Sequence, residues 1–267
     1  KPKKPDLKKW KDFADRISNG NETVEIALIG KYTDLKDSYI SHEESLRYAG
    51  ALLDCKVKIR WIEAPDLEDS GNTESLEGVN GVLVPGGFGS RGSEGKIMSA
   101  KWARENKTPY LGVCFGFQLA TVEFARNVLG LKNANSSELD QDGEHPVIDI
   151  LPEQEGVKDM GATMRLGDHE VVISGGKAKE LYKKDIIFER HRHRYEINPE
   201  YITQIEEKGM KYTGRNKSGR RMEILELENH PYFMASQFHP EFKSRPDNPS
   251  PLHFGLVKAA LEHKKIN

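Results

Sequence analysis

The chain has 267 residues, of which 40 are Lys or Arg and 42 are Asp or Glu, so its formal net charge is -2. This length permits one large domain or two small ones, with enough chain to bury a core. The near-neutral charge gives no reason to expect a nucleic acid or an anionic membrane surface as a partner.

The first residues predict a linker. The segment KPKKPDLKKW is rich in Lys and Pro, which favours extended, solvated chain. Trp10, Phe13 and Ile17 then recur at helical spacing and predict a short docking helix. We expect residues 1–21 to be a linker from a preceding domain, and residues 22–267 to form the domain itself.

Strands and helices alternate through the first half of the chain. Short apolar runs that end in glycine or proline predict strands, and a helical apolar period predicts helices. The expected strands are TVEIALIG, KVKIRWIEA, GVLVPGG and PYLGVC, and the expected helices are SYISHEESLRYAGALL, residues 97–106 and FGFQLATVEFARNVLG. This alternation predicts a parallel sheet with helices on both faces.

The second half is richer in short strands. They are HPVIDILP, ATMRLG, HEVVIS, DIIFER, MKYTGR, RMEILELE and FMASQFH, followed by an amphipathic helix at PLHFGLVKAALEH. We expect these strands to form an added, more antiparallel part of the same sheet. The predicted fold class is therefore α/β: an open, mostly parallel sheet flanked by helices, with additional antiparallel strands in the C-terminal half.

Cysteine usage is sparse, because only Cys55 and Cys114 occur, whereas secreted disulfide scaffolds carry more cysteines in even sets. We therefore expect a reducing, cytoplasmic setting in which both thiols stay free. No window is apolar over the length that a bilayer requires, and the basic start lacks the apolar segment of a signal peptide. We expect no membrane partner.

The strongest chemical motif is GVCFG at residues 112–116, between an expected strand and an expected helix. This G-x-C-x-G pattern is typical of a nucleophile on a sharp strand-to-helix turn, where small flanking residues permit close packing. The helix N-terminus favours the thiolate of Cys114, and the N–H of Phe115 is placed to bind an oxyanion. Cys55 lacks such surroundings and is expected to be a buried structural cysteine.

A thiol nucleophile needs a histidine that takes and returns protons, and a third group that orients the imidazole. His239 ends the expected strand FMASQFH, Pro240 halts that strand, and Glu241 is near enough to reach the far ring nitrogen. We expect Cys114, His239 and Glu241 to lie at the carboxyl ends of two strands, where open α/β sheets place their sites.

The glycine-rich turn VPGGFGSRGSEG permits close approach of the backbone to a ligand. A phosphate cradle is disfavoured because Ile97, and not Ser or Thr, follows Lys96, and the glycine spacing does not match a Walker A loop. Two interpretations stay open: the N–H of Gly87 is a second oxyanion donor, or the segment is a plain flexible loop.

The segment ERHRHRYE is basic and admits two further alternatives. A nucleic-acid patch is disfavoured because the positive charge is isolated and Tyr195 is the single aromatic residue within it. A metal site of His191, His193 and His239 is disfavoured because zinc sites use a fuller ligand set at closer spacing. We expect neither a nucleic-acid partner nor a metal.

The ordered Cys, His and Glu resemble the triad of class I glutamine amidotransferase domains. The segments VPGGFG, YLGVCFGFQ, NANSSE, MGATMRLG, FERHRHRYE and QFHPEF are together similar to the C-terminal glutaminase domain of CTP synthases, from about Val24 to the final helix. One departure is FGFQ at residues 115–118, where that family has Leu-Gly-Met-Gln. We expect this departure to alter packing beneath the nucleophile and to leave the backbone donor in place.

The resemblance implies that the chain hydrolyses L-glutamine to glutamate and ammonia through a cysteine thioester. Cys114 would be the nucleophile, His239 would protonate the leaving ammonia and activate water, and Glu241 would orient His239. The residues implied to bind substrate are Gly87, Phe115, Gly116, Phe117, Gln118, Glu138 and Arg194, with Gly87 and Phe115 forming the oxyanion hole. Arg165 is implied to lie in a lid-like loop linked to GTP activation, and Phe88 to share that response.

The resemblance also implies partners. Ammonia would pass to a synthetase (amidoligase) domain of the same full-length chain, which aminates UTP to CTP with ATP and Mg²⁺. GTP would be an allosteric activator, the glutaminase domain would need no cofactor of its own, and the full-length protein would be a homotetramer. The alternative function is that of another α/β cysteine hydrolase, acting on γ-glutamyl peptides.

Overall fold

The computed structural model describes residues 5–150 and 164–266. One large sheet contains the strands β1 (Glu22–Gly30), β2 (Cys55–Glu63), β3 (Gly81–Val84), β4 (Tyr110–Val113), β7 (Arg165–Ile173), β8 (Ile186–His193), β10 (Met210–Asn216), β11 (Met222–Leu227) and β12 (Phe233–Ser236). A small second sheet contains β5 (Ala134–Ser136), β6 (His145–Asp149) and β9 (Glu196–Ile197). The helices are α1 (Lys8–Asn19), α2 (Ile40–Leu52), α3 (Ala64–Ser70), α4 (Ser93–Glu105), α5 (Phe115–Asn127), α6 (Gly176–Tyr182), α7 (Pro199–Glu207) and α8 (Pro251–Ile266).

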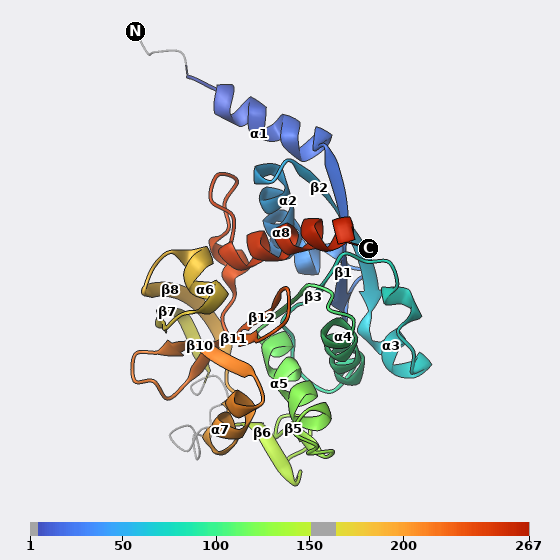
Figure 1. Cartoon of the computed structure of the whole chain (residues 1–267), viewed down its shortest axis with the longest axis vertical. Coiled ribbons are helices and arrows are strands. Elements are labelled where there is room, and N and C mark those ends of the chain that lie inside the picture. The colour runs from blue at the N-terminus through green and yellow to red at the C-terminus, as the bar shows by residue number, and fades with distance from the viewer. Residues whose placement is uncertain (1–4, 151–163, 267) are drawn as a thin grey trace.

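The large sheet has a parallel half and an antiparallel half, in the order β2-β1-β3-β4-β12-β11-β10-β7-β8 (Figure 1). The pairs from β2 to β12 are parallel, and those from β12 to β8 are antiparallel. Strands β3 and β4 are buried along their whole length, as expected for parallel strands covered on both faces. The predicted α/β architecture, with antiparallel strands added in the C-terminal half, is confirmed.

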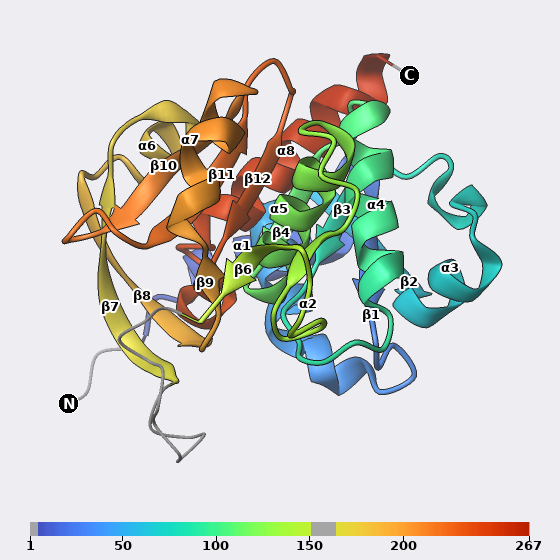
Figure 2. The ribbon, with the colours of Figure 1, turned by 90° about the horizontal axis from the view of Figure 1, so that it is seen from below.

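Two helical layers cover the large sheet. Helices α2 and α8 pack together over β1 to β4 on one face, while α4 and α5 pack together over β3, β4 and β12 on the other (Figure 2). Each layer encloses its own apolar core, with Leu46 and Leu256 in one and Ile97 and Phe124 in the other. The sheet is therefore held between two dry interfaces, which fixes the positions of its strand ends.

Three expectations for the strands were wrong. The segment HPVIDILP contributes β6 to the separate small sheet, and not to the large one, while residues 151 and 152 lie outside the described residues. The segments ATMRLG and HEVVIS form the single strand β7 over the part that is described, because Gly167 adopts a positive φ of 85° and still pairs with His191. Strand FMASQFH ends early, at Ser236.

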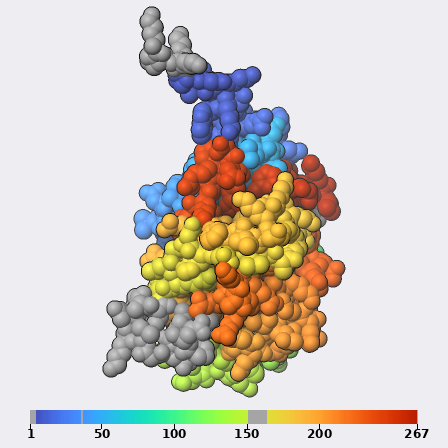
Figure 3. Space-filling model, turned by 90° about the vertical axis from the view of Figure 1, so that its left-hand side faces the viewer, coloured from blue at the N-terminus to red at the C-terminus, as the bar shows by residue number. Residues whose placement is uncertain are grey.

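The predicted docking helix is confirmed as α1, which lies at one end of the long axis of the molecule (Figure 1). None of its residues is buried, but Phe13 packs on Tyr48 of α2, with ring centroids 6.0 Å apart. Figure 3 shows another side of the molecule, where the surface below α1 is formed mainly by the C-terminal half of the chain. The assignment of residues 1–21 as a linker stays a prediction.

Among the described residues, no helix has the length and apolar character needed to cross a membrane.

The contact between α3 and α4 depends on Gly95, where an added Cβ atom would lie 1.9 Å from the carbonyl oxygen of Ala64. We expect Gly95→Ala to lower the free energy of unfolding by about 1–3 kcal/mol, because backbone must move to admit the methyl group. Denaturant titration gives the measurement. The matched control is Lys101→Ala on the exposed side of the same helix, expected within about 0.5 kcal/mol of the parent chain; equal losses in the two variants would contradict the packing argument.

Candidate active site

Cys114 occupies the sharp turn between β4 and α5. Its φ is 53°, a left-handed conformation that side chains rarely adopt, and its N–H donates to the carbonyl oxygen of Ser236 at 2.7 Å. The turn is tight because Gly116 packs on β3, where an added Cβ atom would lie 2.2 Å from the carbonyl oxygen of Val84. The strained nucleophile turn predicted from GVCFG is therefore present.

His239 and Glu241 follow β12, the strand next to β4. The N–H of His239 donates to the carbonyl oxygen of Arg190, and its Nδ1 lies 2.7 Å from Oε1 of Glu241, the second residue of the short helix η4 (Pro240–Lys243). Gly86 lies between nucleophile and base: an added Cβ atom there would be 3.0 Å from Cε1 of His239 and 3.5 Å from Cβ of Cys114. The structure thus brings the three predicted residues together at one edge of the sheet.

The pKa values of His239 and Glu241 are shifted by their neighbours in the site. Burial lowers the pKa of His239, but the negative charges of Cys114 and Glu241, and hydrogen bonds to both, outweigh burial and raise it well above 6.5. Burial raises the pKa of Glu241, whereas His42, His239 and His253 lower it, so that the net value is about 2. The raised pKa places a proton on the imidazole of His239, between the sulfur of Cys114 and the carboxylate of Glu241, where it can serve as a general acid.

Two buried lysines hold the glycine turn after β3. Lys96 Nζ donates to the carbonyl oxygen of Pro85 at 2.8 Å and lies 3.4 Å from that of Gly86, while Lys31 Nζ donates to the carbonyl oxygens of Phe88 and Gly89 at 2.8 and 2.7 Å. In a trans peptide the C=O and the next N–H point in opposite directions. The bond from Lys96 to Gly86 therefore directs the N–H of the following residue away from the lysine.

Gly87 and Phe115, the two residues predicted to supply the oxyanion donors, lie close to each other. A Cβ atom built on Gly87 would lie 3.8 Å from Cδ1 of Phe115 and 3.6 Å from Nζ of Lys96. Phe115 is the first residue of α5, so its N–H has no partner within the helix. Burial lowers the pKa of Lys96 to about 7, and the neighbouring Lys31 lowers it too, against the opposing effect of Cys114.

Two further residues predicted to bind substrate, Phe117 and Gln118, are buried. Phe117 is fully buried and packs on Tyr212, so its side chain belongs to the core. Gln118 is buried, and its amide nitrogen donates to the carbonyl oxygen of Tyr195 at 3.0 Å and lies 3.3 Å from Oε1 of Gln237. The side chain at position 117 is therefore part of the core, and the change of packing expected from the departure from the family sequence stays a prediction.

Glu138 and Arg194 flank Tyr195. Burial raises the pKa of Tyr195, the carboxylate of Glu138 raises it further, and the guanidinium of Arg194 opposes the rise. Oε1 of Glu138 also accepts the N–H of Gly89 at 2.8 Å, which joins it to the glycine turn. The structure thus places a carboxylate and a guanidinium within electrostatic range of the same phenol, and such a pair suits the charged groups of an α-amino acid.

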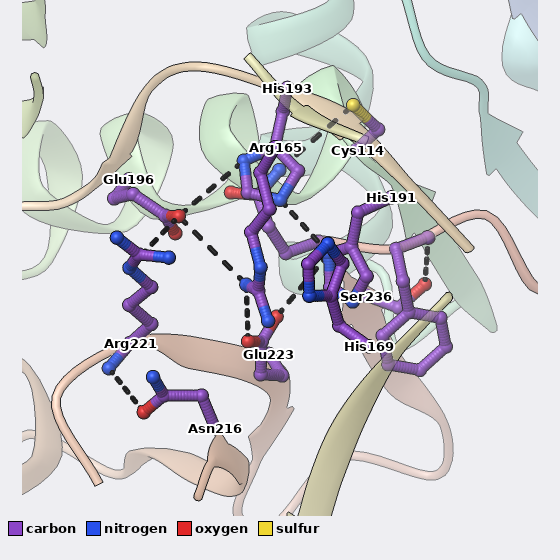
Figure 4. Close-up of polar contacts among 12 residues, drawn as sticks. Cys114, Arg165, His169, His191, His193, Glu196, Asn216, Arg221, Glu223 and Ser236 are labelled. Atoms are coloured by element: carbon purple, nitrogen blue, oxygen red, sulfur yellow. Dashed lines mark hydrogen bonds and ion pairs between the residues drawn. The ribbon is translucent and has the colours of Figure 1, made fainter. Parts of the chain in front are cut away.

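Arg165 is buried in a polar network beneath Cys114 (Figure 4). Its Nη1 lies 2.5 Å from Oε1 of Glu223 and 3.9 Å from Oε1 of Glu196. His191 Nδ1 lies 3.0 Å from Nε2 of His193; burial and the charge of Arg165 lower the pKa of both imidazoles, which are therefore neutral. The expected lid-like loop position of Arg165 is wrong, because Arg165 is the buried first residue of β7 and pairs with His193. Its role in a GTP response stays a prediction, and residues 160–163 of its motif lie outside the described residues.

Phe88 lies exposed beside the turn, with half of its surface accessible (51%). Its side chain is free to meet another molecule, while its carbonyl oxygen is held by Lys31 at 2.8 Å. The GTP response expected of Phe88 stays a prediction. Within residues 5–150 and 164–266, no three His, Cys, Asp or Glu side chains are grouped so as to hold a metal ion.

Sequence reasoning missed four buried polar side chains near the site: Lys31, Lys96, His42 and His253. A signal for the two histidines was present, because each stands on the apolar stripe of a helix. His42 precedes Leu46 and Ala49 by four and seven residues, and His253 precedes Leu256 and Ala260 by three and seven. Lys96 carries the same signal, because it precedes Ala100 and Ala103 on α4 by four and seven residues, whereas Lys31 follows the end of β1 and belongs to no helix.

Comparison with known proteins places the chain among amidotransferases. The family model "Glutamine amidotransferase class-I" matches residues 34–259. The chain is 54% identical over 265 residues to a CTP synthase of Pyrococcus abyssi and 49% identical over 261 residues to a CTP synthase of Bacillus subtilis, covering 98% and 97% of this chain. It covers 49% of each relative, so the chain spans about half the length of the curated relatives it matches.

A solved structure agrees with these matches. The glutaminase domain of Trypanosoma brucei CTPS, with bound acivicin, superposes with a TM-score of 0.84 at 37% sequence identity. The superposition covers 90% of this chain and 94% of that one, so the whole domain is shared.

The raised pKa of His239 depends on Glu241 and is open to a direct test. We expect Glu241→Gln to lower the pKa of His239, because the substitution removes the adjacent negative charge and keeps the size of the side chain. Titration of the imidazole followed by ¹⁵N NMR gives the value, with Glu44→Gln on the outer side of α2 as the control. An unchanged His239 pKa in the Glu241 variant would show that the carboxylate does not act on the base.

Proposed function

The chain belongs to the class I glutamine amidotransferase family, and within it to the glutaminase domains of CTP synthases, and we propose that Cys114, His239 and Glu241 hydrolyse L-glutamine to glutamate and ammonia. The observation that carries this proposal is the meeting of a strained cysteine turn, a protonated imidazole and a carboxylate at one sheet edge. Cys114 follows β4, whereas His239 and Glu241 follow β12, so the convergence of the cysteine with the other two residues is a property of the fold.

The first half-reaction forms a thioester. The Cys114 thiolate attacks the side-chain amide carbon of glutamine, and the carbonyl oxygen becomes an anion that the N–H groups of Gly87 and Phe115 stabilise. His239 gives its proton to the nitrogen as the C–N bond breaks, so ammonia leaves and a γ-glutamyl thioester remains. Glu241 holds the imidazole in the orientation that this transfer needs.

The second half-reaction restores the enzyme. Neutral His239 takes a proton from a water molecule, whose oxygen attacks the thioester carbon. The C–S bond then breaks, the glutamate carboxyl group is released, and the thiolate and the imidazolium are regenerated. Glu138 and Arg194 are proposed to bind the α-ammonium and α-carboxylate groups, since a carboxylate and a guanidinium suit those charges. Gln118 and the backbone of residues 115–117 complete the proposed substrate site.

The activity of the whole protein is also part of the proposal. We infer that ammonia made here serves a synthetase domain that aminates UTP with ATP and Mg²⁺, in a homotetrameric, GTP-activated, cytoplasmic enzyme. Support for this comes from the CTP synthase relatives, in which the matched region is about half of the chain. The names of these relatives do not favour the alternative, a hydrolase of γ-glutamyl peptides.

The nucleophile assignment predicts the outcome of one substitution. We expect Cys114→Ala to reduce glutamine hydrolysis by about 10⁴-fold or more and to prevent labelling by a chloroketone analogue of glutamine, because the attacking sulfur is gone. Intact-protein mass spectrometry with peptide mapping locates the label. Cys55→Ala, which removes the other thiol, is the matched control and keeps both properties; labelling retained at Cys55 in the Cys114 variant, or faster turnover of γ-glutamyl peptides than of glutamine, would defeat the proposal.

The contact between Lys96 and the glycine turn predicts that a substitution of Lys96 changes kcat and leaves KM nearly unchanged. We expect Lys96→Met to lower kcat about 10- to 100-fold and to change KM by less than about threefold. Lys96 holds the turn that directs the N–H of Gly87, and an oxyanion donor acts chiefly in the transition state. Steady-state hydrolysis of glutamine measures both constants. Lys101→Met on the exposed side of the same helix is the control. A Lys96→Met variant with the parent kcat would show that the glycine turn presents its oxyanion donor without the help of Lys96.

A further inference from the structure

A row of buried side chains continues behind Glu241. Nε2 of His42, on α2, lies 3.5 Å from Oε1 of Glu241, the same oxygen that faces Nδ1 of His239. Nδ1 of His42 lies 3.0 Å from Nε2 of His253, on α8, and Nδ1 of His253 lies 2.8 Å from Oγ of Ser250. Both imidazoles are buried, so water does not compete for these contacts.

The two imidazoles behind Glu241 are neutral. Burial lowers the pKa of His42, with His239 and Lys96 acting in the same direction and Glu241 opposing them. Burial also lowers the pKa of His253, to about 3, with His42 adding to the effect and Glu241 opposing it. Each ring therefore has one N–H donor and one accepting nitrogen at neutral pH.

Neutral rings give the row a single direction. A carboxylate only accepts hydrogen bonds, so the hydrogen of His42 belongs on Nε2, facing Glu241. Nδ1 of His42 must then accept, which places the hydrogen of His253 on Nε2. Nδ1 of His253 in turn accepts from the hydroxyl of Ser250, whose oxygen also lies 3.4 Å from the backbone nitrogen of His253. Every donor along the row points toward Glu241.

Beyond His239 and His42, the Glu241 carboxylate has few polar contacts among the described residues. Its Oε2 atom is buried and has no hydrogen-bond partner among the described residues, so Oε1 makes the contacts with both His239 and His42. A carboxylate with a single anchor can rotate about its terminal torsion, and a second anchor on the same oxygen restricts that rotation. The second anchor is built from α2 and α8, the helices that pack over β1 to β4.

We propose that His42 is a positioning residue of this active site, which His253 and Ser250 hold in one tautomer so that it fixes the Glu241 carboxylate against His239. The row extends the Cys114–His239–Glu241 group into the helical layer behind it. His42 touches none of the residues proposed to bind glutamine, so its effect is on proton transfer and not on substrate binding. The kinetic part of this inference rests on the proposed glutaminase function; the structural part does not.

Two substitutions at position 42 separate positioning from packing. We expect His42→Leu to lower kcat for glutamine about tenfold or more, to leave KM within about twofold, and to lower the pKa of His239, because Glu241 loses an anchor. His42→Gln keeps a donor and an acceptor on one side chain, so it restores kcat to within about threefold and restores the His239 pKa. Steady-state kinetics and ¹⁵N NMR titration of the imidazole are the two readouts.

Several results would overturn the inference. A Leu variant with the parent kcat and the parent His239 pKa excludes a positioning role, and a Gln variant as impaired as the Leu variant assigns the effect to packing. If His42→Leu does not fold, His253→Leu is compared with the parent chain in the same assays, and unchanged values there also overturn it. A parent chain that is silent toward glutamine contradicts the proposed function, while the NMR titration still decides whether His42 acts on His239.

Discussion

The structure of the site depends on one partly buried imidazole held between a cysteine sulfur and a carboxylate. His239 lies between Cys114 and Glu241, and its pKa rises well above 6.5 although burial alone would lower it. These interactions depend on geometry, because a displacement would leave the nearly buried carboxylate of Glu241 without its partner. The surrounding fold therefore has to hold the Cys114 turn and the segment His239–Glu241 in fixed relation.

The sheet achieves this by placing β4 and β12 side by side. Both strands end at the same edge, one leading into the Cys114 turn and the other into His239 and η4. The glycine turn after β3 completes the edge, and its carbonyl groups are held by the ammonium groups of Lys31 and Lys96. On the opposite side of Glu241, α2 and α8 contribute His42 and His253, so the helical layer takes part in the site as well as covering the sheet.

Sequence reasoning predicted the parts of this fold that have a regular pattern. The alternating strands and helices, the Cys114 turn and the pair His239 and Glu241 each follow from spacing and residue type. The small second sheet was not predicted, because β5 and β9 have three and two residues and show no period. Gly167 looked like a break and lies instead within β7. The burial of Lys96 and His42 was missed although both stand at helical spacing from buried residues, because a charged or polar residue in a helix is usually exposed.

The central claim is that the sulfur of Cys114, the imidazole of His239 and the two oxyanion donors converge on one reacting carbon. The most direct measurement is a crystal structure of the chain after reaction with a chloroketone analogue of glutamine. The account predicts a covalent bond from Sγ of Cys114 to the analogue, with an N–H of Gly87 or Phe115 within hydrogen-bond distance of its oxygen and His239 beside the sulfur. An adduct on Cys55, or an oxygen directed away from both N–H groups, would contradict it.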